Sequence, residues 1–244
     1  MSLRLAILET DTPVPAAFAK YGSYGDIFRA LLERGGIPSD VEMSYYDVVK
    51  DGDYPPVSDV DAILITGSKF DAHSDLPWIL KLTEFTKQAL KHKKKIIGIC
   101  FGHQILARAL GVNGERNPKG WEVASTEIEL TDVGKKVFSK LSKEHDGTLR
   151  IMQMHQDIVP RVPEGAELLA SSPVCKVQGL YKEEAYISLQ GHPEFVSGIV
   201  DKILDVREQA GVFSEEKMKE YRKLAEKRQD GDAIAKVLVD FLYV

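Results

Sequence analysis

Cys100 lies where the sequence pattern changes from a buried strand to a helix. The apolar residues 96–99 predict a short buried strand, and residues 103–110 are compatible with a helix. Gly98 and Gly102 stand two residues on either side of the cysteine, and they permit the close backbone approach that a tight turn needs. A side chain at such a turn is exposed at the carboxyl edge of a sheet. The pattern is that of a nucleophile elbow with cysteine in place of serine, and it predicts covalent catalysis.

A thiol needs a nearby base or positive charge to become the reactive thiolate. His192 is the best placed of the six histidines, because it follows the apolar run 185–189 at the end of another predicted strand. Glu194 comes two residues later, and residues i and i+2 of an extended segment point to the same side. Pro193 biases His192 away from helical conformation. We therefore expect Cys100 to be the nucleophile, His192 the base and then the acid, and Glu194 the group that orients the imidazole.

Strands and helices alternate along the first 110 residues of the chain. Short apolar runs predict strands at residues 3–8, 41–48, 62–65 and 95–99. Apolar residues at helical spacing predict a helix that ends at Gly35 and Gly36, and a second helix over residues 77–90. This alternation predicts an α/β fold of three layers, with a mostly parallel central sheet flanked by helices. Ligands of such sheets bind at the carboxyl ends of the strands, where Cys100 lies.

The second half of the chain has a different pattern. Alternating residues predict partly antiparallel strands at residues 122–130, 149–154 and 185–190. Helical spacing then predicts helices at residues 198–210, 214–228 and 233–242. Ser214 is the expected N-cap of the second of these helices. We expect residues 1–197 to form a catalytic domain, and residues 198–244 to form a helical extension packed on the same domain.

The composition is that of an ordinary soluble protein. The chain has 244 residues, of which 43% are hydrophobic and 28% charged, with a formal net charge of −5. This mild acidity argues against a nucleic-acid partner. Two cysteines and no recognisable signal peptide indicate a reducing, cytoplasmic setting. No membrane contact is expected, since no stretch approaches the ~20 apolar residues that a membrane span needs.

Three motifs resemble those of the class I glutamine amidotransferase family. They are ICFGHQ at residues 99–104, MHQDIV at 154–159 and LQGHPEF at 189–195, in the family's order. The family uses a Cys-His-Glu triad to attack the γ-amide of a glutamyl group. The resemblance therefore implies a small-molecule γ-glutamyl substrate, and it implies that neither a metal nor an organic cofactor is required.

The resemblance also implies an oxyanion hole made of backbone N–H groups. One donor would be Phe101, the residue after the cysteine. The other would come from the turn after the strand at 62–65, at Gly67 and Ser68. Many family members carry Gly-Gly-Pro at this turn, whereas this chain has Thr66-Gly67-Ser68-Lys69. The departure leaves open whether the hole is preformed.

Substrate contacts are likewise implied by the resemblance. Gln104 corresponds to a glutamine that contacts the glutamyl group, and His155 and Asp157 lie in the segment near its α-amino and α-carboxylate ends. The alternatives are that Gln104 solvates a helix face and that the other two brace a loop. His103 points elsewhere on its helix and is interpreted as structural.

Several other candidate residues allow more than one interpretation. Cys175 has no elbow and no base nearby, so we expect an inert thiol. Trp121 and Glu122 could line the mouth of the cleft or belong to the core. His73 and Asp75 lie in the loop after the oxyanion turn, where they could reach a substrate or face solvent.

The segments ITGSKFDAHSDLPWI at residues 65–79 and KKKIIGICFGHQI at 93–105 resemble a stand-alone branch that includes γ-glutamyl peptidases and GMP-synthase-like amidotransferase domains. The sequence shows no P-loop and no second domain long enough to be a synthase. We therefore expect hydrolysis or transfer of a γ-glutamyl group, from glutamine or a glutathione-type peptide, through a Cys100 thioester. The alternatives are a glutaminase subunit that delivers ammonia to a separate synthase, and a non-catalytic regulatory module. The identity of the leaving amine stays open.

Overall fold

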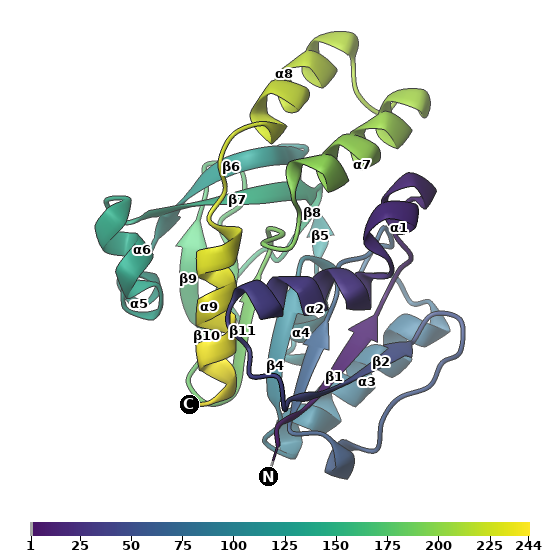
Figure 1. Cartoon of the computed structure of the whole chain (residues 1–244), viewed down its shortest axis with the longest axis vertical. Helices are drawn as coiled ribbons and strands as arrows, with labels where there is room; N and C mark the ends of the chain where they lie inside the picture. Colours follow the sequence, from purple (N-terminus) through teal and green to yellow (C-terminus); the bar gives the residue numbers. More distant parts are fainter. Residues whose placement is uncertain (1) are drawn as a thin grey trace.

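The computed structural model of the chain describes residues 2–244, apart from the side chain of Ser142. These residues form a nine-stranded sheet in the order β2-β1-β3-β4-β11-β10-β9-β6-β7, with helices on both faces (Figure 1). Its parallel part consists of β1 (Arg4–Glu9), β2 (Glu42–Asp47), β3 (Ala62–Ile65), β4 (Lys95–Ile99) and β11 (Tyr186–Leu189). Its antiparallel part consists of β10 (Gly179–Lys182), β9 (Glu167–Ser171), β6 (Glu122–Leu130) and β7 (Thr148–His155). The predicted α/β fold class is confirmed.

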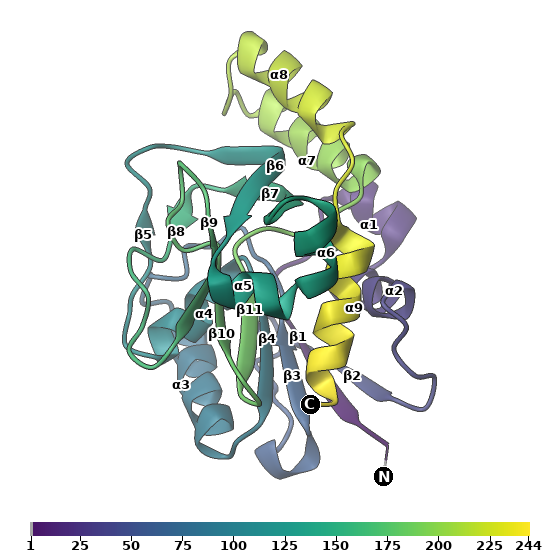
Figure 2. The ribbon, with the colours of Figure 1, turned by 90° about the vertical axis from the view of Figure 1, so that its left-hand side faces the viewer.

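Side chains of β1 alternate between the two faces of the sheet. Leu5 and Ile7 belong to the apolar cluster of helices α2 (Tyr24–Arg34) and α9 (Gly231–Leu242). Ala6 and Leu8 belong to the cluster of α3 (Pro77–Lys91) and α4 (Phe101–Ala109). Figure 2 shows the two helix pairs on opposite sides of the strands. This three-layer packing holds the carboxyl ends of β3, β4 and β11 side by side.

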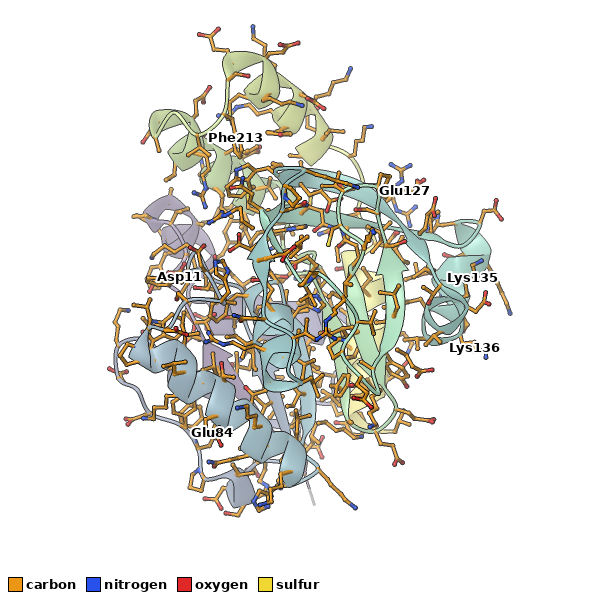
Figure 3. All side chains as sticks on the ribbon, turned by 180° about the vertical axis from the view of Figure 1, so that it is seen from behind. Asp11, Glu84, Glu127, Lys135, Lys136 and Phe213 are labelled. Atoms are coloured by element: carbon orange, nitrogen blue, oxygen red, sulfur yellow. The ribbon has the colours of Figure 1, made fainter. Side chains whose placement is uncertain are left out.

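Helices α7 (Ser197–Gln209) and α8 (Glu215–Ala225) form a pair beyond the end of the sheet (Figure 1). They pack against β6 and α1 (Pro15–Tyr21). Phe213 lies on the connection between them (Figure 3), edge-on to Trp121 and Tyr221 at ring-centroid distances of 5.4 and 5.1 Å. The domain division at residue 197 stays a prediction. Among residues 2–244, no helix combines the length and apolar composition needed to cross a membrane.

The strands predicted at residues 62–65 and 95–99 coincide with β3 and β4. Ser214 caps α8 as expected, since its side chain accepts a hydrogen bond from the N–H of Lys217. Several elements were not predicted. Pro15, in a segment where no helix was predicted, occupies the first turn of α1, where its fixed φ is favourable. The other unpredicted elements are α5 (Asp132–Val137), α6 (Ser139–Glu144), the 3₁₀ turn η1 (Val57–Asp59), strands β9 and β10, and the short pair β5 (Glu115–Arg116) and β8 (Asp157–Ile158).

Candidate active site

Cys100 occupies a strained turn between β4 and α4. Its φ of 52° and ψ of −101° lie outside the usual regions for an L-residue, at a cost of about 1–3 kcal/mol. The glycines at the turn are required by space. A Cβ on Gly98 would lie 2.7 Å from the carbonyl oxygen of Gly102, and one on Gly102 would lie 2.2 Å from that of Ile65. The turn therefore has the backbone geometry of a nucleophile elbow.

His192 and Glu194 lie beyond the end of β11. The extended backbone predicted for this segment is wrong, because Pro193 and Glu194 form a turn in which the N–H of Phe195 donates to the carbonyl oxygen of His192 at 3.4 Å. His192 Nδ1 is 2.7 Å from Glu194 Oε1, and both side chains are buried. The backbone N–H of His192 donates to the carbonyl oxygen of Met152 at 2.7 Å, which ties the segment to β7. The imidazole also stacks on Phe195, at 4.0 Å between ring centroids and an angle of 2°. These contacts fix the ring and leave Nε2 as the nitrogen available to Cys100.

The pKa of His192 reflects these neighbours. Burial lowers it, but the charges of Glu194 and Cys100, with hydrogen bonds to both, raise it to about 10. At neutral pH the imidazole is therefore protonated next to the sulfur. A protonated imidazole stabilises a thiolate, which is the nucleophilic form of cysteine.

The turn after β3 lies against the same two side chains. A Cβ on Gly67 would lie 2.8 Å from His192 Cε1 and 3.7 Å from Cys100 Cβ. Thr10 fixes this turn, because its hydroxyl donates to the carbonyl oxygen of Gly67 at 2.9 Å and its own carbonyl accepts from Ser68 Oγ at 2.7 Å. The C=O and N–H of one trans peptide unit point in opposite directions. The N–H of Ser68 therefore points away from Thr10.

Two backbone N–H groups near the thiol are available as donors. Within residues 2–244, the N–H groups of Ser68 and Phe101 donate to no protein acceptor. Phe101 is the first residue of α4, where helix geometry leaves the N–H without an intrahelical partner. The turn sequence differs from Gly-Gly-Pro, and within the described residues it leaves the N–H of Ser68 without a protein acceptor. The oxyanion role of this N–H stays a prediction.

A chain of buried amides leads away from the thiol. Gln190 Nε2 lies 3.5 Å from Cys100 Sγ, and its Oε1 accepts from Gln104 Nε2 at 3.0 Å. Gln104 Nε2 also donates to the backbone carbonyl of Asp157 at 3.0 Å, and His155 Nδ1 contacts the same carbonyl at 3.0 Å. The structure thus brings Gln104 and His155 onto the Asp157 loop. Gln190 was not among the residues predicted for the site, although it lies directly after β11 and two residues before His192.

The other nitrogen of His155 faces a buried carboxylate. His155 Nε2 is 3.1 Å from Glu122 Oε2, and Glu122 also accepts from Ser172 Oγ at 2.6 Å and Gln178 Nε2 at 2.8 Å. Glu122 therefore belongs to the interior, whereas its neighbour Trp121 lines the cleft beside Cys100.

Asp157 joins a charged cluster at the cleft. Its carboxylate is 3.0 Å from Arg116 Nε and 3.7 Å from His73 Nδ1. Arg116 also contacts Asp71 Oδ1 at 3.1 Å. Burial and a hydrogen bond with Asp71 raise the pKa of Asp157 to about 6. Asp71, His73 and Asp157 could together offer ligand atoms to a metal ion, but the Arg116 guanidinium already places a positive charge on both carboxylates.

The remaining sequence candidates lie away from the reacting centre. Asp75 is exposed and pairs with Arg108 at 2.7 Å. Burial lowers the pKa of His103 to about 3, and its Nδ1 lies 2.8 Å from Ser188 Oγ, as suits a structural histidine. Burial raises the pKa of the Cys175 thiol to about 12, so this cysteine carries no reactive thiolate at neutral pH.

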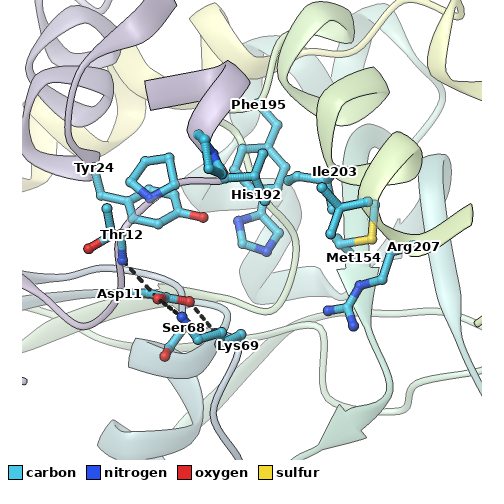
Figure 4. Close-up of a pocket in the computed structure, with 14 residues that line it drawn as sticks. Asp11, Thr12, Tyr24, Ser68, Lys69, Met154, His192, Phe195, Ile203 and Arg207 are labelled. Carbon is cyan, nitrogen blue, oxygen red and sulfur yellow. Dashed lines mark hydrogen bonds and ion pairs between the residues drawn. The ribbon is translucent and has the colours of Figure 1, made fainter. Parts of the chain in front are cut away.

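Two cavities meet at the site. The smaller, about 60 Å³, contains Cys100 and Gln104 in its wall together with Asp157. The larger, about 440 Å³, contains His192 in its wall and is shown in Figure 4. The residues that line both cavities are Ser68, Lys69, Met154 and Arg207.

The sequence matches the family described as glutamine amidotransferase class-I over residues 22–204. A glutamine amidotransferase-like protein of Schizosaccharomyces pombe is 42% identical over 252 residues, which cover 99% of each chain. Gamma-glutamyl peptidase 4 of Arabidopsis thaliana is 35% identical over 220 residues, which cover 88% of this chain and 85% of the peptidase. The crystal structure of a glutamine amidotransferase from Thermotoga maritima shares the fold, with a TM-score of 0.76 over the whole of both chains at 20% identity.

Proposed function

Because the chain belongs to the class I glutamine amidotransferase family, as its motifs predicted, we propose that it hydrolyses or transfers γ-glutamyl groups through a thioester on Cys100. The observation that carries the proposal is the thiol on a strained strand-to-helix turn, next to an imidazole held 2.7 Å from a buried carboxylate. Strain of this kind persists only where the surrounding structure enforces it, and it is concentrated at functional sites.

Acylation begins with the Cys100 thiolate. Its sulfur attacks the γ-carbonyl carbon, so that an S–C bond forms and the carbonyl oxygen becomes an oxyanion. The N–H groups of Phe101 and of the Gly67-Ser68 turn donate to this oxyanion. When the C–N bond breaks, the protonated His192 gives its proton to the leaving amine. Glu194 holds the imidazole in the required orientation throughout.

Deacylation returns the site to its starting state. A water molecule adds to the thioester carbon while His192, now neutral, accepts its proton. Breaking the S–C bond releases glutamate and restores the thiolate beside a protonated imidazole. An amine in place of water would give transfer instead of hydrolysis.

The charged cluster suits the zwitterionic end of a glutamyl group. We propose that Asp157 and Asp71 attract the α-ammonium group, and that Arg116 attracts the α-carboxylate. Gln104 and His155 then act by holding the Asp157 loop, since both contact its carbonyl oxygen. In this arrangement Gln104 and His155 support the substrate site and also line it.

The raised pKa of Asp157 predicts a pH effect on substrate capture. Its carboxylate is charged above about pH 6 and protonated below it, so the attraction for the α-ammonium is lost as the pH falls. We expect kcat/KM, which reports the free enzyme, to fall by up to tenfold per pH unit below about 6. Asp157→Asn should lower kcat/KM at pH 7.5 and remove this inflection. An inflection near pH 6 that persists in the variant would contradict the assignment.

A substrate panel on the purified chain tests the function. Glutamine, glutathione and γ-glutamyl dipeptides are supplied separately, without any other protein, and released glutamate is followed. We expect release from at least one peptide. If Cys100 is alkylated readily but no substrate releases glutamate, the chain is either a glutaminase subunit that needs its synthase or a regulatory module.

A further inference from the structure

The larger cavity begins at the group that protonates the leaving amine. His192 is part of its wall, so an amine that has just accepted a proton from this histidine lies next to the cavity. Its volume of about 440 Å³ is within the ordinary range for small-molecule sites, roughly 300–1,000 Å³. Ammonia is similar in size to water, which occupies about 30 Å³ per molecule in the liquid. A cavity this large at this position fits a leaving group much bigger than ammonia.

Apart from Met154 of β7, the apolar walls of this cavity come from segments outside the sheet. The loop after β1 contributes Val14, and α7 contributes Ile203 and Val206. Phe195 adds an aromatic face next to His192, and the Tyr24 hydroxyl adds a neutral polar group whose pKa burial raises far above neutrality. The cavity therefore offers apolar surface and few polar groups to a side chain of the leaving amine.

Among residues 2–244, one positive charge in this cavity has no carboxylate partner. Lys69 is neutralised by Asp11, whose carboxylate lies 2.7 Å from its Nζ and also accepts from its backbone N–H at 2.9 Å (Figure 4). Arg207 reaches into the cavity from α7 beside Met154 (Figure 4). Its guanidinium stacks over Trp121 at 5.2 Å, and within residues 2–244 no carboxylate with a described position pairs with it. Guanidinium is charged at every working pH and binds carboxylates through paired hydrogen bonds.

We propose that this cavity holds the leaving amine and that Arg207 binds a carboxylate carried by that amine. This proposal rests on the proposed function and narrows it. The substrates are then γ-glutamyl amino acids or short γ-glutamyl peptides with a free C-terminus, and glutamine is a poor substrate. Arg207 is a specificity residue, and its side chain is oriented by stacking on Trp121.

The test compares two substrates that share the γ-glutamyl amide. γ-Glutamylglycine carries a carboxylate on the leaving amine, and γ-glutamyl ethylamide is of similar size without one. The wild-type chain is expected to prefer γ-glutamylglycine by at least about tenfold in kcat/KM, the range for a charge-assisted hydrogen bond. Arg207→Gln should lower kcat/KM for γ-glutamylglycine by about 10–100-fold and leave the ethylamide within twofold.

The matched control is Lys202→Gln, which removes a positive charge from the same helix outside the cavity. This variant should leave kcat/KM unchanged for both substrates. Equal losses on both substrates in Arg207→Gln would place the guanidinium on the shared glutamyl end and overturn the proposal. Equal wild-type rates on both substrates would overturn it without any variant. Absence of glutamate release from either substrate is a different result, because it contradicts the proposed function itself.

Discussion

Cys100→Ala is expected to abolish glutamate release, with kcat/KM for every γ-glutamyl substrate falling by at least about 10⁴-fold. The expectation follows from covalent catalysis, because among residues 2–244 no other thiol lines the cleft. Losses of this size accompany removal of the nucleophile in related triads, where binding and the oxyanion donors leave only a residual rate. Release of glutamate is measured with substrate well below and well above KM, so that kcat and kcat/KM are separated.

The matched control for this variant is Cys175→Ala. Cys175 is also buried, but its Sγ donates to the carbonyl oxygen of Val177 and burial raises its pKa to about 12. Removing this thiol should leave kcat/KM within about twofold, with a modest loss of stability from the small cavity. Equal loss of activity in the two variants would indicate damage to the fold. Activity that survives in Cys100→Ala would rule out a Cys100 thioester.

The predictable parts of the site are those encoded by local sequence. Cys100 could be placed because a buried strand, two flanking glycines and a helix-compatible run occupy adjacent residues. Glu194 could be paired with His192 because the two residues are close in the chain, although a turn at Pro193 and Glu194, and not the predicted extended backbone, brings their side chains together. The carboxyl ends of β4 and β11 then meet because both strands are parallel neighbours in the sheet.

The parts that could not be predicted depend on long-range packing. Asp71, Arg116 and Asp157 come from three separate segments, and nothing in their spacing says that their side chains meet. Arg207 lies seven residues after Val200 and three after Leu204, on the buried side of α7, but this spacing does not say whether its long side chain ends in a cleft or in bulk solvent. Tertiary structure alone decides which of these two an arginine faces.

Strands β9 and β10 were not predicted for a similar reason. β9 and β10 have five and four residues, and Gly179 weakens the alternation that would mark β10. Their pairing is determined by neighbours more than by propensity. These strands nevertheless matter for the site, because they lie between β11 and the pair of strands β6 and β7. Strand β7 carries His155 and Met152.

Removing the positive charge beside the thiol is expected to make Cys100 less reactive. In the wild-type chain His192, with a pKa of about 10, is protonated at neutral pH and places its charge beside the sulfur. In His192→Ala this charge is absent, so the Cys100 thiolate loses its stabilisation. Alkylation of Cys100 by iodoacetamide, followed from pH 5 to 10, should therefore be slower than in the wild-type chain at neutral pH, and kcat/KM should fall by about 10⁴-fold.

Glu194→Gln tests the charge that raises the pKa of the imidazole. The amide keeps the size of the side chain but removes the carboxylate that opposes the effect of burial, so the pKa of His192 should fall. We expect kcat to drop by about 10²–10⁴-fold and the alkylation profile to lie between those of the wild type and His192→Ala.

Glu122→Gln is the matched control for Glu194→Gln, because Glu122 is a second buried carboxylate that faces a histidine, His155, at 3.1 Å. This control should leave the alkylation profile of Cys100 unchanged once folding is verified by thermal unfolding. A shift of equal size in both variants would mean that any buried charge nearby alters the thiol. In that case the specific pairing of Glu194 with His192 would not explain the reactivity of Cys100.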